Sequence, residues 1–205
     1  ANVEFPVAFG GAHSLALGDL DLDGKMDIIT VNFSANSISV LRNISTGNIT
    51  SASFAQKVDF NTGQAPISIA LGDLDGDGKL DISIVNVNST SVSIFRNIST
   101  TGTFNTSSLA ARVDFSTGLN PQSVAIGDID GDSKSDLVVA NTNGFNVSVW
   151  KNIASNGSFS ASSLAPRIDI PAGSSQPFHV TIGDLDGDSR PDFVLTNRSS
   201  NSISV

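Results

Sequence analysis

Four acidic loops are the stretches of this sequence whose residues could do chemistry. The loop at residues 73–81 carries aspartates at relative positions 1, 3, 5 and 9, with glycine at positions 4 and 6. Carboxylates packed this densely repel one another unless a cation lies among them. Ca²⁺ is the cation that best suits several hard oxygen ligands arranged around a tight turn. The sequence therefore predicts a Ca²⁺ site in this loop.

The loop occurs four times, with starts 54, 55 and 56 residues apart. Its sixteen aspartates are Asp19, Asp21, Asp23 and Asp27; Asp73, Asp75, Asp77 and Asp81; Asp128, Asp130, Asp132 and Asp136; and Asp184, Asp186, Asp188 and Asp192. A period of this length indicates an array of similar structural units. We therefore expect about four Ca²⁺ ions, one for each repeat.

The charge of the chain follows the same repeat. The net charge is −9, and sixteen of the 20 acidic residues belong to the loops. The other four, Glu4, Asp59, Asp114 and Asp169, are spaced 55 residues apart. Four bound Ca²⁺ would bring the net charge to about −1, so the acidity serves metal binding. No basic patch is available to neutralise phosphates, which argues against a nucleic-acid partner.

Composition also restricts the setting. The chain has no Cys and therefore no disulfides. If the protein is secreted, we expect metal ions to provide the stabilising links instead. No apolar run approaches the roughly 18 residues of a membrane helix, and no membrane span is expected. The first residues do not resemble a signal peptide, so we expect any leader to have been removed or to lie outside this sequence. The expected location is extracellular, at the cell surface.

The elements that must position the loops are short strands. In each unit one strand runs into the loop and an apolar strand leaves it. A third strand alternates Ser or Asn with branched apolar residues, and a fourth carries Val-Asp-Phe or a variant of it. No helical period is present. The pattern predicts an all-β, β-propeller-type array of four four-stranded antiparallel sheets in a single domain over residues 1–205. The expected blades cover approximately residues 12–60, 65–115, 121–170 and 177–205.

The two ends of the sequence complement each other. The fourth unit stops at Val205, within its third strand, whereas residues 1–6 match a fourth strand with no unit before it. The N-terminal strand would complete the last sheet in cis, or complete the last sheet of a neighbouring copy. The remaining alternative is that the chain is a window of a longer repeat array.

Taken together, these features resemble the FG-GAP/VCBS-type repeat, the Ca²⁺-binding blade of integrin α-subunit propellers and of many bacterial surface proteins. The resemblance rests on the D-x-D-x-D-G-x-x-D loop, the Gly-Asp that opens it, and an apolar strand that ends in Asn32, Asn86, Asn141 or Asn197. Residues 9–12, Phe-Gly-Gly-Ala, are similar to the signature that gives the family its name. The match extends over nearly the whole chain.

The resemblance implies that four aspartate side chains and one backbone carbonyl bind each ion. The carbonyls would be those of Lys25, Lys79, Lys134 and Arg190. Two departures from the family pattern stand out. Position 6 of the loop is Ser133 or Ser189 in the last two units, where a left-handed turn favours Gly, so weaker sites are expected there. Propellers of the family usually have seven blades, whereas four are visible here.

Two other classes of protein fit poorly. An EF-hand needs flanking helices and a Glu at position 12, where this chain has Thr30, Ile84, Val139 or Leu195. An enzyme needs a nucleophile, a base or an open metal position, but the chain has no Cys, and His13 and His179 are not repeat-equivalent. We therefore expect no enzymatic activity and no catalytic residues.

The sequence thus predicts an extracellular Ca²⁺-binding propeller protein with a structural or adhesive role, in which Ca²⁺ rigidifies the loops. Its partner would be a protein or glycan at the cell surface. One alternative is a self-assembling extracellular fibre subunit, in which copies join head to tail by strand donation. The other is a non-catalytic domain of a polysaccharide-active enzyme.

Overall fold

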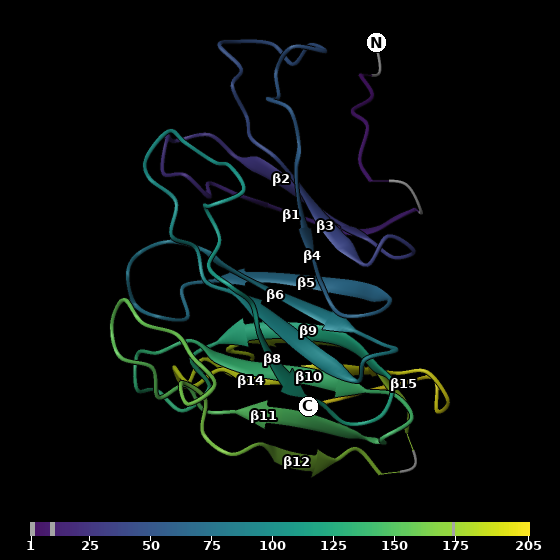
Figure 1. Ribbon diagram of the computed structural model, residues 1–205. Coiled ribbons are helices and arrows are strands. Elements are labelled where there is room, and N and C mark those ends of the chain that lie inside the picture. The colour runs from purple at the N-terminus through teal and green to yellow at the C-terminus, as the bar shows by residue number, and fades with distance from the viewer. Residues whose placement is uncertain (1–2, 9–10, 174) are drawn as a thin grey trace.

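The computed structural model describes residues 3–8, 11–173 and 175–205, which form four antiparallel sheets (Figure 1). The described residues contain strands and turns but no helix, so none of their segments is a helix that could cross a membrane. The all-β architecture predicted from the repeat, with sheets that match propeller blades, is therefore confirmed.

The first three sheets have four strands each, paired in sequence order. The first contains β1 (Ala12–Gly18), β2 (Asp27–Asn32), β3 (Ser37–Leu41) and β4 (Val58–Asn61). The second contains β5 (Pro66–Gly72), β6 (Asp81–Asn86), β7 (Ser91–Phe95) and β8 (Val113–Ser116). The third contains β9 (Pro121–Gly127), β10 (Asp136–Asn141), β11 (Asn146–Trp150) and β12 (Ile168–Pro171).

The fourth sheet has three strands, β13 (Pro177–Gly183), β14 (Asp192–Asn197) and β15 (Ser202–Ser204). Its predicted fourth strand was residues 1–6, of which residues 1 and 2 lie outside the described part. Residues 3–8 form no strand and lie beside the first sheet instead, where the rings of Phe5 and Phe54 are 4.8 Å apart. The N-terminal segment thus does not complete the fourth sheet of its own chain in this structure.

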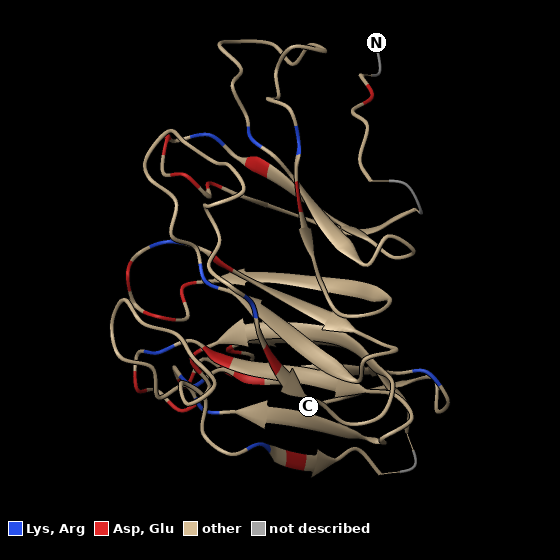
Figure 2. Ribbon diagram, in the orientation of Figure 1, with Lys and Arg blue, Asp and Glu red and all other residues tan. Residues whose placement is uncertain are grey.

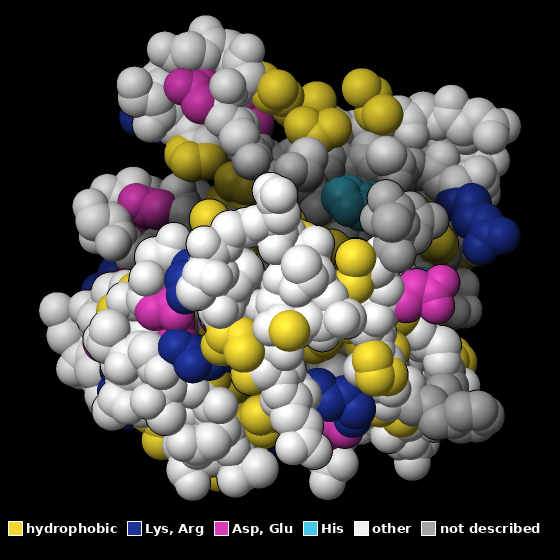
Figure 3. Space-filling view, turned by 90° about the horizontal axis from the view of Figure 1, so that it is seen from above, with side chains coloured by type: hydrophobic (Ala, Val, Ile, Leu, Met, Phe, Trp, Pro, Cys, Tyr) yellow, Lys and Arg dark blue, Asp and Glu magenta, His cyan; other side chains and the backbone are white. Residues whose placement is uncertain are grey.

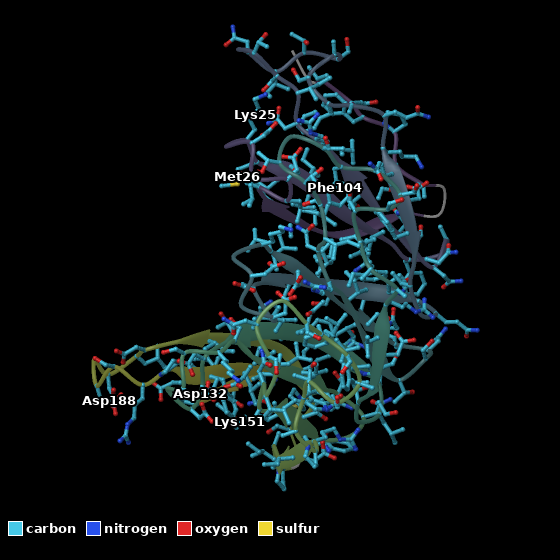
Figure 4. The ribbon with its side chains drawn as sticks, turned by 60° about the vertical axis from the view of Figure 1, so that its left-hand side comes forward. Lys25, Met26, Phe104, Asp132, Lys151 and Asp188 are labelled. Atoms are coloured by element: carbon cyan, nitrogen blue, oxygen red, sulfur yellow. The ribbon has the colours of Figure 1, made fainter. Side chains whose placement is uncertain are left out.

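The sheets pack face to face through their first strands. β1 contacts β5, β5 contacts β9, and β9 contacts β13, and an apolar cluster fills each of the three spaces between sheets. Between the first and second sheets, Ile29 and Ile38 pack with Ile84 and with Phe104, which reaches across to the neighbouring sheet (Figure 4). The four sheets follow one another as an open stack, and the described residues form no closed ring (Figure 1).

A polar ladder runs through each of the first three sheets, on the serine face of the third strand. In the second sheet, Asn86 Nδ2 donates to Ser93 Oγ at 2.8 Å, and Ser93 Oγ donates to Asp114 at 2.6 Å. Asn86 and Ser93 are fully buried. Because a buried hydroxyl must find a partner, the ladder fixes the lateral order of β6, β7 and β8. It also explains why the apolar second strand ends in Asn.

Candidate metal centres

The four acidic loops join the first and second strands of their sheets and lie along one edge of the stack (Figure 2). In every loop, oxygen atoms of the aspartates at positions 1, 3 and 9 lie within 4.8 Å of one another. The four triads are Asp19, Asp21 and Asp27; Asp73, Asp75 and Asp81; Asp128, Asp130 and Asp136; and Asp184, Asp186 and Asp192. Three of the four predicted carboxylates in each loop are thus brought together.

The aspartate at position 1 shapes the turn. In the second loop, Asp73 Oδ1 accepts from the amide of Gly76 at 2.7 Å, and Asp73 Oδ2 accepts from the amide of Gly78 at 2.8 Å. Asp19, Asp128 and Asp184 make the same kind of bonds to their own loops. These amides neutralise part of the carboxylate charge and fold the loop around the space between the triad oxygens.

The aspartate at position 9 begins the second strand and is fully buried in the first three loops. Asp81 accepts from the amides of Leu74 at 2.9 Å and Asn97 at 2.7 Å, which ties the loop to the end of β7. Burial is the main reason that the pKa of Asp81 rises from 3.8 to about 7, although both hydrogen bonds lower it. Burial likewise raises the pKa of Asp27 to about 6. A cation among the loop oxygens would remove this cost of ionisation.

In the first three loops, the aspartate at position 3 faces a basic side chain at the end of the third strand. Asp21 pairs with Arg42, Asp75 with Arg96, and Asp130 with Lys151. Asp21 is fully buried, and its Oδ1 has no hydrogen-bond partner among the described residues. A buried carboxylate oxygen without a partner is costly, and Asp21 is a member of the first triad. Of the observations at the four loops, this unpartnered oxygen best fits the binding of a cation.

The aspartate at position 5 is not part of any triad. Its carboxylate accepts from the amide at position 7, for example from Lys79 to Asp77 at 3.0 Å, and it contacts the same basic residue as position 3. Lys151 lies beside Asp132, with their charged atoms 3.2 Å apart (Figure 4). The pKa of Lys151 is raised by its hydrogen bonds to Asp130 and Asp132. The carbonyl ligands Lys25, Lys79, Lys134 and Arg190 stay a prediction.

Each loop needs the left-handed conformation at positions 4 and 6. Position 6 has φ of +85° at Gly24 and +83° at Gly78, but also +68° at Ser133 and +67° at Ser189. The left-handed turn expected at position 6 is therefore present in all four loops. Position 4 is Gly in three loops, whereas in the first loop it is Leu22, with φ of +55°. A side chain at such a position strains the backbone.

The loop of one sheet is also held by the following unit. Asn97 Nδ2 and Ser99 Oγ both donate to the carbonyl oxygen of Leu20 at 2.8 Å, and the amide of Gly102 donates to that of Asp21 at 2.9 Å. In the third unit, Asn152 and Gly157 repeat this arrangement toward the second loop. The ordering of a loop is thereby coupled to the packing of the next sheet.

The donor set fits Ca²⁺ well. It consists only of oxygen atoms, its carboxylates converge, and one of its buried oxygens lacks a partner. The two features missed from the sequence are the basic partner and the bonds from the following unit. Their signal was present in the repeated dipeptides Arg42-Asn43, Arg96-Asn97 and Lys151-Asn152, which close the third strand.

Comparison with known protein families agrees with this geometry. The profile of the FG-GAP-like repeat matches residues 19–84, 82–139 and 128–195, which together span most of the chain. The protein therefore belongs to the FG-GAP-like repeat family. None of the curated proteins that were searched matches it.

Proposed function

We propose that this protein is an extracellular Ca²⁺-binding repeat protein with a structural or adhesive role, in which Ca²⁺ holds the four loops rigid. The observation that carries the proposal is the buried, unpartnered Oδ1 of Asp21 within a carboxylate triad that recurs in every sheet. When bound, the ion would supply the positive charge that these triads lack. We assign no catalytic role to the protein.

The residues around each loop have different roles. The position-1 aspartates fold the turn, the position-9 aspartates anchor it to the second and third strands, and the basic residues neutralise positions 3 and 5. Because the unfolded chain has no such preformed site, the free energy of binding becomes free energy of folding. Millimolar Ca²⁺ outside cells would keep sites of modest affinity filled, which favours an extracellular location.

Calorimetric titration of the protein with Ca²⁺, combined with thermal unfolding, tests the proposal. We expect saturable binding and a melting temperature that rises with Ca²⁺ concentration. The variant Asp81→Asn should lose one binding event, whereas the control Asp169→Asn, which removes an acid of the outer strand β12, should lose none. Equal binding by both variants would refute the assignment of the triads.

A further inference from the structure

Equivalent apolar residues form the contact between each pair of consecutive sheets. Each first strand turns the same two apolar positions toward the preceding sheet: Ile69 and Leu71 of β5 pack into the cluster of the first sheet, and Val124 and Ile126 of β9 into that of the second. The receiving sheet offers residues such as Ile38 and Val40, which are 0% and 1% exposed. A repeat in this stack therefore has a docking face and a receiving face.

Among the described residues, no other sheet covers the docking face of the first sheet. Leu15 and Leu17 of β1, the equivalents of Ile69 and Leu71, are 65% and 59% exposed. The side-chain amide of Asn43, the equivalent of Asn97, donates only to the carbonyl of Met26 among the described residues, whereas that of Asn97 also reaches across to the preceding sheet. This end of the molecule is shown in Figure 3, where hydrophobic side chains reach the surface.

The receiving face of the fourth sheet is exposed in the same way. Ile203 and Val205, the equivalents of Ile38 and Val40, are 68% and 75% exposed, and Leu185 on the fourth loop is exposed as well. The two exposed faces lie at opposite ends of the stack, so they do not meet within one copy (Figure 1). They carry the two halves of a contact that the chain already makes three times.

The edge of the fourth sheet lacks one specific partner. The ladder serines Ser39, Ser93 and Ser148 each donate to an aspartate of the fourth strand, at 2.6, 2.6 and 2.7 Å. Ser204 occupies the equivalent place in β15, which pairs with no fourth strand among the described residues. Glu4 is the repeat equivalent of those aspartates.

The segment at residues 3–6 is already placed as a fourth strand of an adjoining sheet. Phe5, the equivalent of Phe60, contacts Phe54 and lines with it and Leu41 a cavity of about 330 Å³. Phe60 of β4 packs against the second sheet through a cluster that contains Phe95 and Leu109, the equivalents of Leu41 and Phe54. The segment thus stands beside the first sheet as β4 stands beside the second.

We infer that the fourth sheet of a second copy docks on the first sheet, and that residues 3–6 become its fourth strand, with Glu4 opposite Ser204. Continuity with the contacts between sheets inside the chain identifies the occupant as a second copy of this chain. The contact would cover both apolar faces and satisfy the unpaired edge of β15. It is heterologous, so copies join head to tail in a ring or an open chain.

Light scattering after chromatography of the 205-residue chain in saturating Ca²⁺ tests the inference. We expect a mass of two or more copies that increases with concentration. Leu17→Asp and Val205→Asp each place a charge on one exposed face, so each should weaken association by about tenfold or more. Mixing the two variants should restore a species of two copies only, because one intact pair of faces remains. Leu119→Asp, at an exposed apolar position away from both faces, is the matched control.

A cross-link tests the strand pairing itself. The chain has no Cys, so a disulfide between Glu4→Cys and Ser204→Cys would report only the proposed register. We expect oxidation to give covalent dimers and longer species, and much less product from Glu4→Cys combined with Ser202→Cys. A wild-type chain that stays a single copy at all concentrations overturns the inference, as does equal weakening by Leu119→Asp. Intramolecular disulfides alone would also overturn it.

Discussion

Leu22 holds a left-handed backbone conformation at a position that is glycine in the other three loops. It adopts φ of +55° where the other loops have Gly76, Gly131 and Gly187, and its side chain is exposed. Leu22→Gly should therefore stabilise the protein by about 0.5–1 kcal/mol. This value is the free energy of backbone strain that Gly relieves, minus the free energy lost because Gly gives the unfolded chain more conformational entropy. Urea unfolding measures the change. Gly76→Leu is the reverse control and should destabilise the second loop, and equal stabilities would contradict the argument.

Arg96 competes with a cation for the same carboxylates. It pairs with Asp75, and its Nη2 lies 3.6 Å from Asp77. Arg96→Ala should lower the stability of the metal-free protein by about 1–3 kcal/mol, because it leaves the buried Asp75 carboxylate without its ion pair. It should also strengthen Ca²⁺ binding at the second loop severalfold, because a positive charge beside the ion is removed.

Calorimetry on Arg96→Ala separates these two effects. Arg112→Ala, which breaks a similar pair with Asp114 on β8, away from the loops, is the control and should leave Ca²⁺ affinity unchanged. A fall in affinity for Arg96→Ala would show instead that the guanidinium positions the carboxylates for the ion.

The strand pair β5–β6 makes its loop sensitive to pH. Burial at the start of β6 raises the pKa of Asp81 to about 7 from 3.8, so between these values the folded chain binds more protons than the unfolded chain. The stability of the metal-free protein should therefore fall as pH rises from 5 to 8. Ca²⁺ needs the ionised carboxylates, so its stabilising effect should grow over the same range.

Thermal unfolding at pH 5, 6, 7 and 8, with EDTA and with Ca²⁺, checks this dependence. Asp81→Asn removes one titrating group and should reduce the slope of the profile measured with EDTA, while Asp27, whose pKa burial also raises, keeps part of it. A metal-free melting temperature that is constant or rises over this range would contradict the prediction.

The connection after β7 holds two sheets together through Asn97. Its Nδ2 donates to the carbonyls of Leu20 and Leu80 at 2.8 and 3.0 Å, and its side chain is buried. Asn97→Ala should cost about 2–3 kcal/mol, because it leaves buried groups unpaired. Asn43→Ala, at the equivalent place without the bond between sheets, should cost about 1 kcal/mol or less. Similar values in urea unfolding would show that the bond across the sheets adds little.

The repeat made much of the fold predictable. Four loops in phase determined where the strands begin, and the structure starts β2, β6, β10 and β14 at the position-9 aspartates. What the pattern could not give depends on contacts between segments distant in sequence. The burial of Ser93 between Asn86 and Asp114, the pairing of Arg96 with Asp75 and the position of residues 3–8 all arise from tertiary packing.

The stack as a whole predicts an uneven distribution of stability. Every residue of β6 and β10 is buried between two neighbouring sheets, whereas most of β14 is partly or fully exposed, because its sheet packs on one side only. In stacked repeats each unit is stabilised mainly by its neighbours, so the fourth sheet should open at a lower free energy than the middle sheets. Hydrogen exchange in Leu17→Asp, which should weaken the proposed docking between copies, should be faster in β14 than in β6 and β10. Equal protection of all three strands would mean that the stack unfolds as one cooperative unit.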